Sequence, residues 1–209
     1  MHTYNKSMQK MHCFFNLSVL FFRDFCYNIS HVLRIDFQSL RKGEQMMKRN
    51  IVLVGMMGSG KSHIGRKLAR RLKWQFVDTD RRLERRVGMS IAEFYKYAGE
   101  KVFREKEVNI LHQVSRYHEA VISFGGNFPM NVDTYRILHR YGVIVALASE
   151  PYRVEERVSR HIGKRPTVDY DNLHRFVRLM MKQWEEVYPY CDFTIDTTCG
   201  GASQIVEMI

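Results

Sequence analysis

The sequence lacks the patterns that mark several classes of protein. Its four cysteines form no C-x-x-C pair and its nine histidines do not gather at the spacing of metal ligands, which argues against a zinc-binding module. The apolar stretch at residues 11–22 is interrupted by polar groups and is shorter than the roughly 20 residues that span a bilayer. No basic run is interleaved with aromatic residues, so we expect neither a nucleic-acid nor a membrane partner.

Acidic residues are few. The chain of 209 residues has 22 Asp and Glu against 33 Lys and Arg, a net charge of +11, which suits an enzyme with anionic ligands. The length fits one domain with an appendage. Lys6 and Lys10 precede the apolar stretch as in a signal peptide, but no small-residue cleavage site follows it. We predict that residues 1–47 are an N-terminal extension, disordered or from a misassigned start, and that residues 48–209 form the folded domain.

A glycine-rich loop is the most informative feature. Residues 55–62 read GMMGSGKS, after an apolar run at 50–54 and before residues 64–72 at helical spacing. Strand, G-x-x-x-x-G-K-S and helix in that order indicate a phosphate-binding P-loop, whereas a plain glycine turn would not explain the Lys-Ser pair. We predict that ATP is bound here, with a lysine on the β- and γ-phosphates and a serine on Mg²⁺. The predicted nucleotide-binding residues in the loop are Gly58, Ser59, Gly60, Lys61, Ser62 and His63.

Strands and helices are predicted to alternate along the rest of the chain. Apolar runs predict buried strands; they lie at 75–77, 120–124, 143–147 and 193–195. Helical patterns occupy 81–86, 103–114, 131–141, 151–160, 172–187 and 202–208. Ser90 and Glu93 predict a capping box that starts a further helix, and Gly99 predicts a break in that helix. With the first strand, this alternation predicts a five-stranded parallel sheet in a three-layer α/β/α fold, with ligands at the carboxyl ends of the strands.

Four further motifs fall where such a sheet would gather them. They are Asp78-Thr79-Asp80, the sequence GEKVFR at 99–104, Gly125-Gly126 and Arg165-Pro166. Together with the P-loop, and in this order, they resemble the shikimate kinase family from about residue 49 to the end of the chain. The resemblance implies a small P-loop kinase with a mobile lid at about 160–172. It also implies transfer of the ATP γ-phosphate to the 3-hydroxyl of shikimate, a step in aromatic amino acid biosynthesis.

The resemblance also implies roles for single residues. Asp80 would hold the acceptor hydroxyls and draw off the proton. Lys61 and the lid residue Arg165 would be the other catalytic groups, with Arg165 closing over the nucleotide phosphates. Asp78 would support Mg²⁺ together with Ser62, in part through water. We expect the protein to be cytoplasmic, because such an enzyme draws on cytosolic ATP. We also expect a monomer with a small-molecule substrate.

Substrate contacts are implied for Arg104, which would pair with the acceptor carboxylate, and for Gly125 and Gly126, which would let the backbone approach the acceptor. Each motif also has a simpler explanation. Asp78 or Asp80 could cap the following helix, Arg104 could belong to a solvated charged face, and the glycine pair could be a plain turn. The joint occurrence of these motifs favours the functional interpretation.

The sequence departs from the family pattern at three positions. Asn127 stands where a third glycine is usual, and His63 stands where threonine is common. The family's second substrate-carboxylate arginine falls on Gln183 or Trp184, with Lys182 beside them. This last departure keeps a second hypothesis open, a P-loop kinase for another small hydroxylated acid or polyol. A nucleotide-binding protein without catalysis is a third.

Overall fold

The structure is a computed structural model that describes residues 50–128, 130–160 and 168–209. These residues all belong to one compact unit, Lys48–Ile209. The predicted extension at 1–47 and the lid residue Arg165 lie outside the described residues. The division of the chain at residue 47 therefore stays a prediction.

Five parallel strands form a single sheet, as the sequence predicts. The spatial order is β2-β3-β1-β4-β5. Val52 at the centre of β1 is paired with Ile122 on one side and Ile144 on the other. The strands are β1 (Asn50–Val54), β2 (Gln75–Asp78), β3 (Ala120–Ser123), β4 (Gly142–Ala148) and β5 (Phe193–Asp196).

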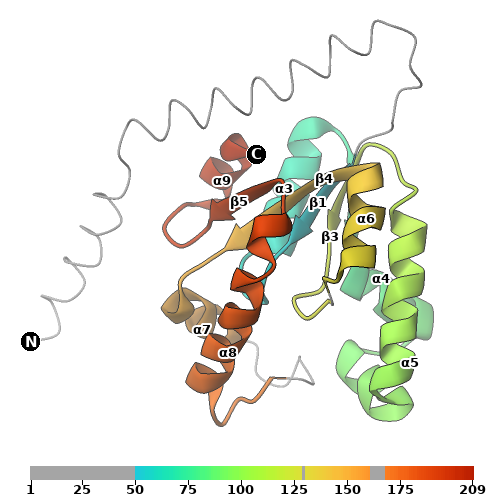
Figure 1. Ribbon diagram of the computed structural model, residues 1–209, viewed down its shortest axis with the longest axis vertical. Helices are drawn as coiled ribbons and strands as arrows, with labels where there is room; N and C mark the ends of the chain where they lie inside the picture. The colour runs from blue at the N-terminus through green and yellow to red at the C-terminus, as the bar shows by residue number, and fades with distance from the viewer. Residues whose placement is uncertain (1–49, 129, 161–167) are drawn as a thin grey trace, which may run out of the picture. The chain divides into compact units, whose positions relative to one another are not determined.

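Helices cover both faces of the sheet (Figure 1). Successive strand residues point to opposite faces, so Val52 packs into one apolar cluster and its neighbour Leu53 into another. Helices α3 and α9 bury the cluster around Leu53, and α5, α6 and α8 lie over the other. This is the predicted three-layer α/β/α architecture. The helices are α3 (Lys61–Leu72), α4 (Thr79–Val87), α5 (Ile91–Val114), α6 (Val132–Tyr141), α7 (Pro151–Ser159), α8 (Leu173–Glu185) and α9 (Ala202–Met208), with the 3₁₀ turn η1 (Tyr188–Tyr190).

Local signals in the sequence set several helix ends. The Ser90 hydroxyl accepts a hydrogen bond from the Glu93 amide, and the Glu93 carboxylate accepts one from the Ser90 amide, which confirms the capping box. Gly99 has a φ of 75° and kinks α5, which confirms the predicted break. Helix α4 begins at Thr79, two residues before the predicted start, because Asp78 provides its cap. Asp80 consequently lies in the first turn of α4.

The parallel arrangement brings all five carboxyl ends to one edge of the sheet. The P-loop leaves β1 there, Asp78 ends β2, and Gly125 and Gly126 follow β3. Residues that are far apart in the sequence therefore gather at this edge. Among the helices of the described residues, none combines the length and apolar character that crossing a bilayer requires.

Candidate active site

The P-loop between β1 and α3 suits an anion. Gly58 and Gly60 have φ angles of 78° and 96°, values that glycine adopts without strain. Gly60 immediately precedes α3, whose first turn carries no acidic side chain. The partial positive charge at the N-terminus of α3 is therefore not neutralised by its own side chains. A phosphate placed at this end would meet backbone N–H groups and a favourable dipole.

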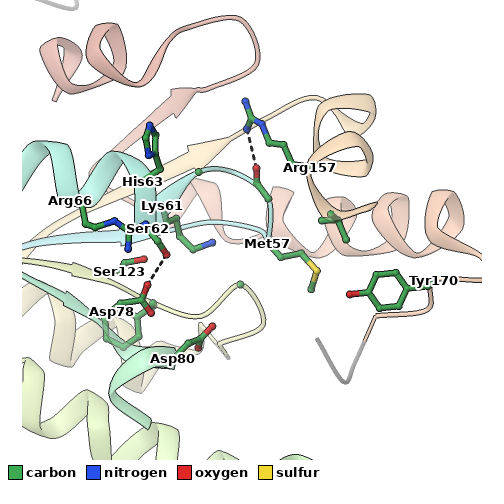
Figure 2. Close-up of a pocket in the computed structure, with 15 residues that line it drawn as sticks. Met57, Lys61, Ser62, His63, Arg66, Asp78, Asp80, Ser123, Arg157 and Tyr170 are labelled. Carbon is green, nitrogen blue, oxygen red and sulfur yellow. Dashed lines mark hydrogen bonds between the residues drawn. The ribbon is translucent and has the colours of Figure 1, made fainter. Parts of the chain in front are cut away.

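Lys61 is held inside this loop. Its side-chain Nζ donates hydrogen bonds to the carbonyl oxygens of Gly55 and Met56, at 2.6 and 2.8 Å. The residue is only 7% exposed. Figure 2 shows its ammonium group at the wall of a cavity beside the loop. The loop thus fixes a cation where the phosphates of a nucleotide would lie.

Ser62 and Asp78 bring two oxygens together at the same place. The Ser62 hydroxyl donates to Asp78 Oδ2 at 2.7 Å, and Asp78 Oδ1 accepts from the backbone N–H of Arg81 (Figure 2). Asp78 therefore caps α4, which confirms the simpler explanation for this residue. Its carboxylate also faces Ser62, and its role at Mg²⁺ stays a prediction. No group of three or more His, Cys, Asp or Glu that could hold a metal occurs among the described residues. Two oxygen ligands fit Mg²⁺, which takes most of its ligands from water and phosphate.

The cavity beside the loop has a volume of about 290 Å³. Five of the six predicted loop residues line it, namely Gly58, Gly60, Lys61, Ser62 and His63. The side chain of Ser59 is buried instead, and its carbonyl oxygen accepts a hydrogen bond from Thr197. Ser59 can therefore contact a nucleotide only through its backbone. Asp78 and Asp80 also line this cavity.

Arg157 on α7 is a residue of this cavity that the sequence did not reveal. Its guanidinium donates to the carbonyl oxygen of Gly58 at 2.9 Å and to that of Thr197 at 3.0 Å. It thereby ties the P-loop to the segment that follows β5. Burial, followed by the charge of Arg153, lowers the pKa of Arg157. In the sequence it is one of several arginines on a helix, and nothing local distinguishes it.

A second, smaller cavity adjoins the first. Asp80, Met57 and Gly126 line both cavities. Asp80 therefore lies at the boundary between the nucleotide side and the second cavity. The predicted substrate residues Arg104, Gly125 and Gly126 all line this second cavity.

The glycine pair after β3 is packed too closely to be a plain turn. A Cβ atom on Gly125 would lie 2.5 Å from Asp80 Oδ1, and one on Gly126 would lie 2.5 Å from the Met57 nitrogen. Thr79 fixes the turn further, because its hydroxyl accepts from the Gly125 N–H and donates to the Ser123 carbonyl. The missing side chains leave room for the Asp80 carboxylate and the P-loop. The Gly125 N–H is already bonded to Thr79, so it is not available to a bound substrate.

Arg104 faces the second cavity and is not a member of a solvated surface. Its Nη1 donates to Glu107 Oε2 at 2.8 Å and to the Asn127 carbonyl at 2.9 Å, while Nη2 lies 3.6 Å from Glu100. Burial raises the pKa of Glu107 to about 7, and the charge of Asp80 acts in the same direction. The hydrogen bond and charge of Arg104 lower it, but by less. In the sequence, nothing local distinguishes Glu107 from the other charged residues of α5.

The position of the family's second arginine contributes no cation to either cavity. Trp184 is 4% exposed and packs in the apolar core, while Gln183 and Lys182 are exposed. None of the three lines either cavity. Arg104 is thus the one cation among the described residues that line the second cavity. The proposed role of Arg165 stays a prediction, since that residue lies outside the described part of the chain.

Comparison with known proteins gives a consistent result. The sequence model of the family described as shikimate kinase matches residues 57–209. A shikimate kinase from Pelotomaculum thermopropionicum is 34% identical over 77% of this chain and 93% of its own length. A shikimate kinase from Thermus thermophilus is also 34% identical, over 76% of this chain and 86% of its own.

Solved structures agree. The shikimate kinase from Acinetobacter baumannii in complex with shikimate superposes with a TM-score of 0.72 at 28% identity, covering 77% of this chain and 89% of its own. The shikimate kinase from Bacteroides thetaiotaomicron gives a TM-score of 0.69 at 28% identity, covering 76% and 94%. With a family match over most of the folded unit and relatives at 34% identity, the chain belongs to the shikimate kinase family.

Proposed function

We propose that this protein is a shikimate kinase, which transfers the γ-phosphate of ATP to the 3-hydroxyl of shikimate in aromatic amino acid biosynthesis. The observation that carries the proposal is the position of Asp80 between two cavities. One cavity is walled by Lys61 and the P-loop, and the other by Arg104. A hydroxylated acid anchored in the second cavity would place a hydroxyl near Asp80, facing the phosphates in the first.

The nucleotide side needs no covalent help from the protein. Phosphoryl transfer depends mainly on positioning and on neutralising charge. Lys61 and the N-terminus of α3 would hold the β- and γ-phosphates. Ser62 and Asp78 would hold Mg²⁺, which would neutralise charge on the phosphate oxygens. Arg157 would keep the loop in place through its bond to the Gly58 carbonyl.

Asp80 would act on the acceptor hydroxyl. In the transfer, the hydroxyl oxygen forms a bond to the γ-phosphorus while the bond to the bridging oxygen of ADP breaks. The hydroxyl proton passes to the Asp80 carboxylate. Gly125 supports this role because its missing side chain leaves space for that carboxylate.

Arg104 would bind the acceptor carboxylate by charge-assisted hydrogen bonds. The second cavity, at about 30 Å³, is too small to enclose a ring acid. An acceptor anchored there would have to extend into the larger cavity, and so toward the phosphates. The predicted lid at about 160–172 would close over it, with Arg165 reaching the phosphates.

A kinase for another small hydroxylated acid or polyol is the second candidate. It is favoured by one observation, that Lys182, Gln183 and Trp184 line neither cavity. A coupled assay of ADP release separates the two candidates. We expect shikimate to stimulate ADP release far more than quinate, gluconate or glycerol does. If shikimate gives no more release than the ATP-only background, the shikimate assignment is refuted.

Localisation and assembly follow from the same proposal. The protein would act in the cytoplasm, where ATP is available, as a monomer with its active site formed within one chain. Size-exclusion chromatography with light scattering measures the assembly. A measured mass of two chains would contradict the monomer.

A further inference from the structure

The second cavity has an unequal balance of charge. Among the described residues that line it, the carboxylates of Asp80 and Glu107 face one guanidinium, that of Arg104. An acceptor carboxylate would be a third negative charge competing for the same cation. Burying such an excess of like charge is costly, so a protein either adds a cation or neutralises an acid. The described residues that line the cavity add no further cation.

We propose that Glu107 takes up one proton when an acceptor carboxylate binds beside Arg104, so that acceptor binding is linked to protonation of this side chain. The proposal rests on the proposed function, because it requires an acceptor with a carboxylate. Glu107 would be a positioning residue, acting through Arg104 and not through contact with the reacting atoms.

The geometry of Glu107 suits it for this exchange. The residue is 8% exposed, and its Oε2 accepts from Arg104 Nη1 at 2.8 Å. When protonated, the carboxyl group keeps a carbonyl oxygen that can still accept this hydrogen bond. Arg104 is also held by the Asn127 carbonyl. The guanidinium of Arg104 therefore keeps its position. Because Glu107 is then neutral, the positive charge of Arg104 can pair with the acceptor carboxylate.

Charged groups on two elements face Glu107. Asp80 approaches from α4, and Arg104 lies on α5, the same helix as Glu107. Tyr95 of α5 also lines the cavity, and Glu100 lies on the far side of Arg104 at 3.6 Å. Asp80 opposes ionisation of Glu107 and Arg104 favours it. A new carboxylate at Arg104 would weaken the favourable effect and add to the unfavourable one.

The direction of the pH effect follows. The pKa of Glu107 in the empty site is about 7, and a bound carboxylate raises it further. Below that value Glu107 is protonated with or without acceptor, so affinity does not vary with pH. Above it, the complex binds more protons than the free protein, so the acceptor Kd rises with pH. The limit, for a full proton taken up, is about tenfold per pH unit.

Isothermal titration calorimetry of the full chain with shikimate, at pH 7.5 in HEPES and in Tris, measures proton uptake directly. The two buffers have different ionisation enthalpies, so the difference in heat gives the number of protons bound. We expect more than about half a proton per shikimate in the wild type. The neutral carboxamide of shikimate should bind without proton uptake, since it adds no charge.

Variants test which side chain takes the proton. In Glu107→Gln the uptake should vanish and the shikimate Kd should change less than about twofold from pH 7 to 9. Glu105→Gln is the matched control, because Glu105 is exposed on the same helix and lines neither cavity. It should keep the wild-type uptake and the wild-type slope.

The outcomes are distinguishable. Shikimate binding without proton uptake in the wild type would overturn the linkage and leave the kinase function standing. Uptake that persists in Glu107→Gln would assign the proton to another group and would also overturn it. Absence of shikimate binding at every pH would refute the acceptor assignment and the linkage together. The comparison of two buffers uses the wild-type protein. It can therefore overturn the proposal even if the Glu107→Gln variant folds poorly.

Discussion

Arg104→Leu tests the acceptor side of the site. This substitution removes the one cation among the described lining residues of the second cavity. A charge-assisted hydrogen bond contributes about 1.5–3 kcal/mol, or roughly ten- to a hundredfold in affinity. Because the described wall offers no replacement cation, we expect a loss toward the upper end, with an acceptor KM about a hundredfold higher. The KM for ATP should change little, since Arg104 does not line the nucleotide cavity.

The same substitution should destabilise the fold in a pH-dependent way. Glu107 loses a partner inside the protein, and an unsatisfied buried group costs about 1–3 kcal/mol. Arg104 lowers the pKa of Glu107, so its removal raises that pKa above about 7. An acid whose folded pKa is raised binds more protons when folded, so stability falls as pH rises through the interval up to that pKa. The stability deficit of the variant should therefore grow between pH 7 and 8.5.

The assays are steady-state kinetics with shikimate and ATP varied separately, and urea denaturation at pH 6.5, 7.5 and 8.5. Lys106→Leu is the control, because it removes a positive charge from an exposed site on the same helix. A shikimate KM within about twofold of the wild type would refute the carboxylate role, since even a surface ion pair contributes up to about 1 kcal/mol. Equal rises in both KM values would indicate general damage to the site instead.

Three further substitutions test the remaining parts of the site. Lys61→Ala should lower kcat at least about a hundredfold, because it removes a cation from the phosphates; turnover near the wild-type level would refute its role. Asp80→Asn should lower kcat by about 10²–10⁴ while the ATP Kd, measured by calorimetry, stays unchanged; normal turnover would remove Asp80 from the mechanism. Gly125→Ala should lower kcat with little change in melting temperature, because the new Cβ would lie 2.5 Å from Asp80 Oδ1; an unchanged kcat would show that this carboxylate has room to move.

Local sequence patterns predicted the elements well. The capping box at Ser90 and the kink at Gly99 were both predicted, because a cap and a glycine break depend on residues within one helical turn. The start of α4 was placed two residues late. The sequence left open whether Asp78 or Asp80 capped that helix, and the structure assigns the cap to Asp78. Which of the two aspartates caps α4 depends on where β2 ends. The end of β2 is set by its pairing with β3, which the sequence does not show.

The two site residues that could not be predicted from the sequence share one property. Arg157 and Glu107 are charged residues on helices with charged neighbours, and no local pattern separates them from a solvated face. Arg157 owes its place to carbonyl oxygens about 40 and 99 positions away in the chain. The sequence also left open whether the position of the family's second arginine falls on Gln183 or Trp184. The burial of Trp184 in the core and the exposure of Gln183 are tertiary facts.

The sequence by itself determined the kind of ligand and the layer architecture. A P-loop depends on contiguous residues whose backbone freedom and charge are encoded locally, and alternating strands and helices allow few arrangements. Only the tertiary structure decided that Asp80 borders two cavities and that Glu107 shares Arg104 with the site. Burial and the distance between charges depend on which elements pack together, and these quantities set the pKa of Glu107 and the balance of charge around an acceptor.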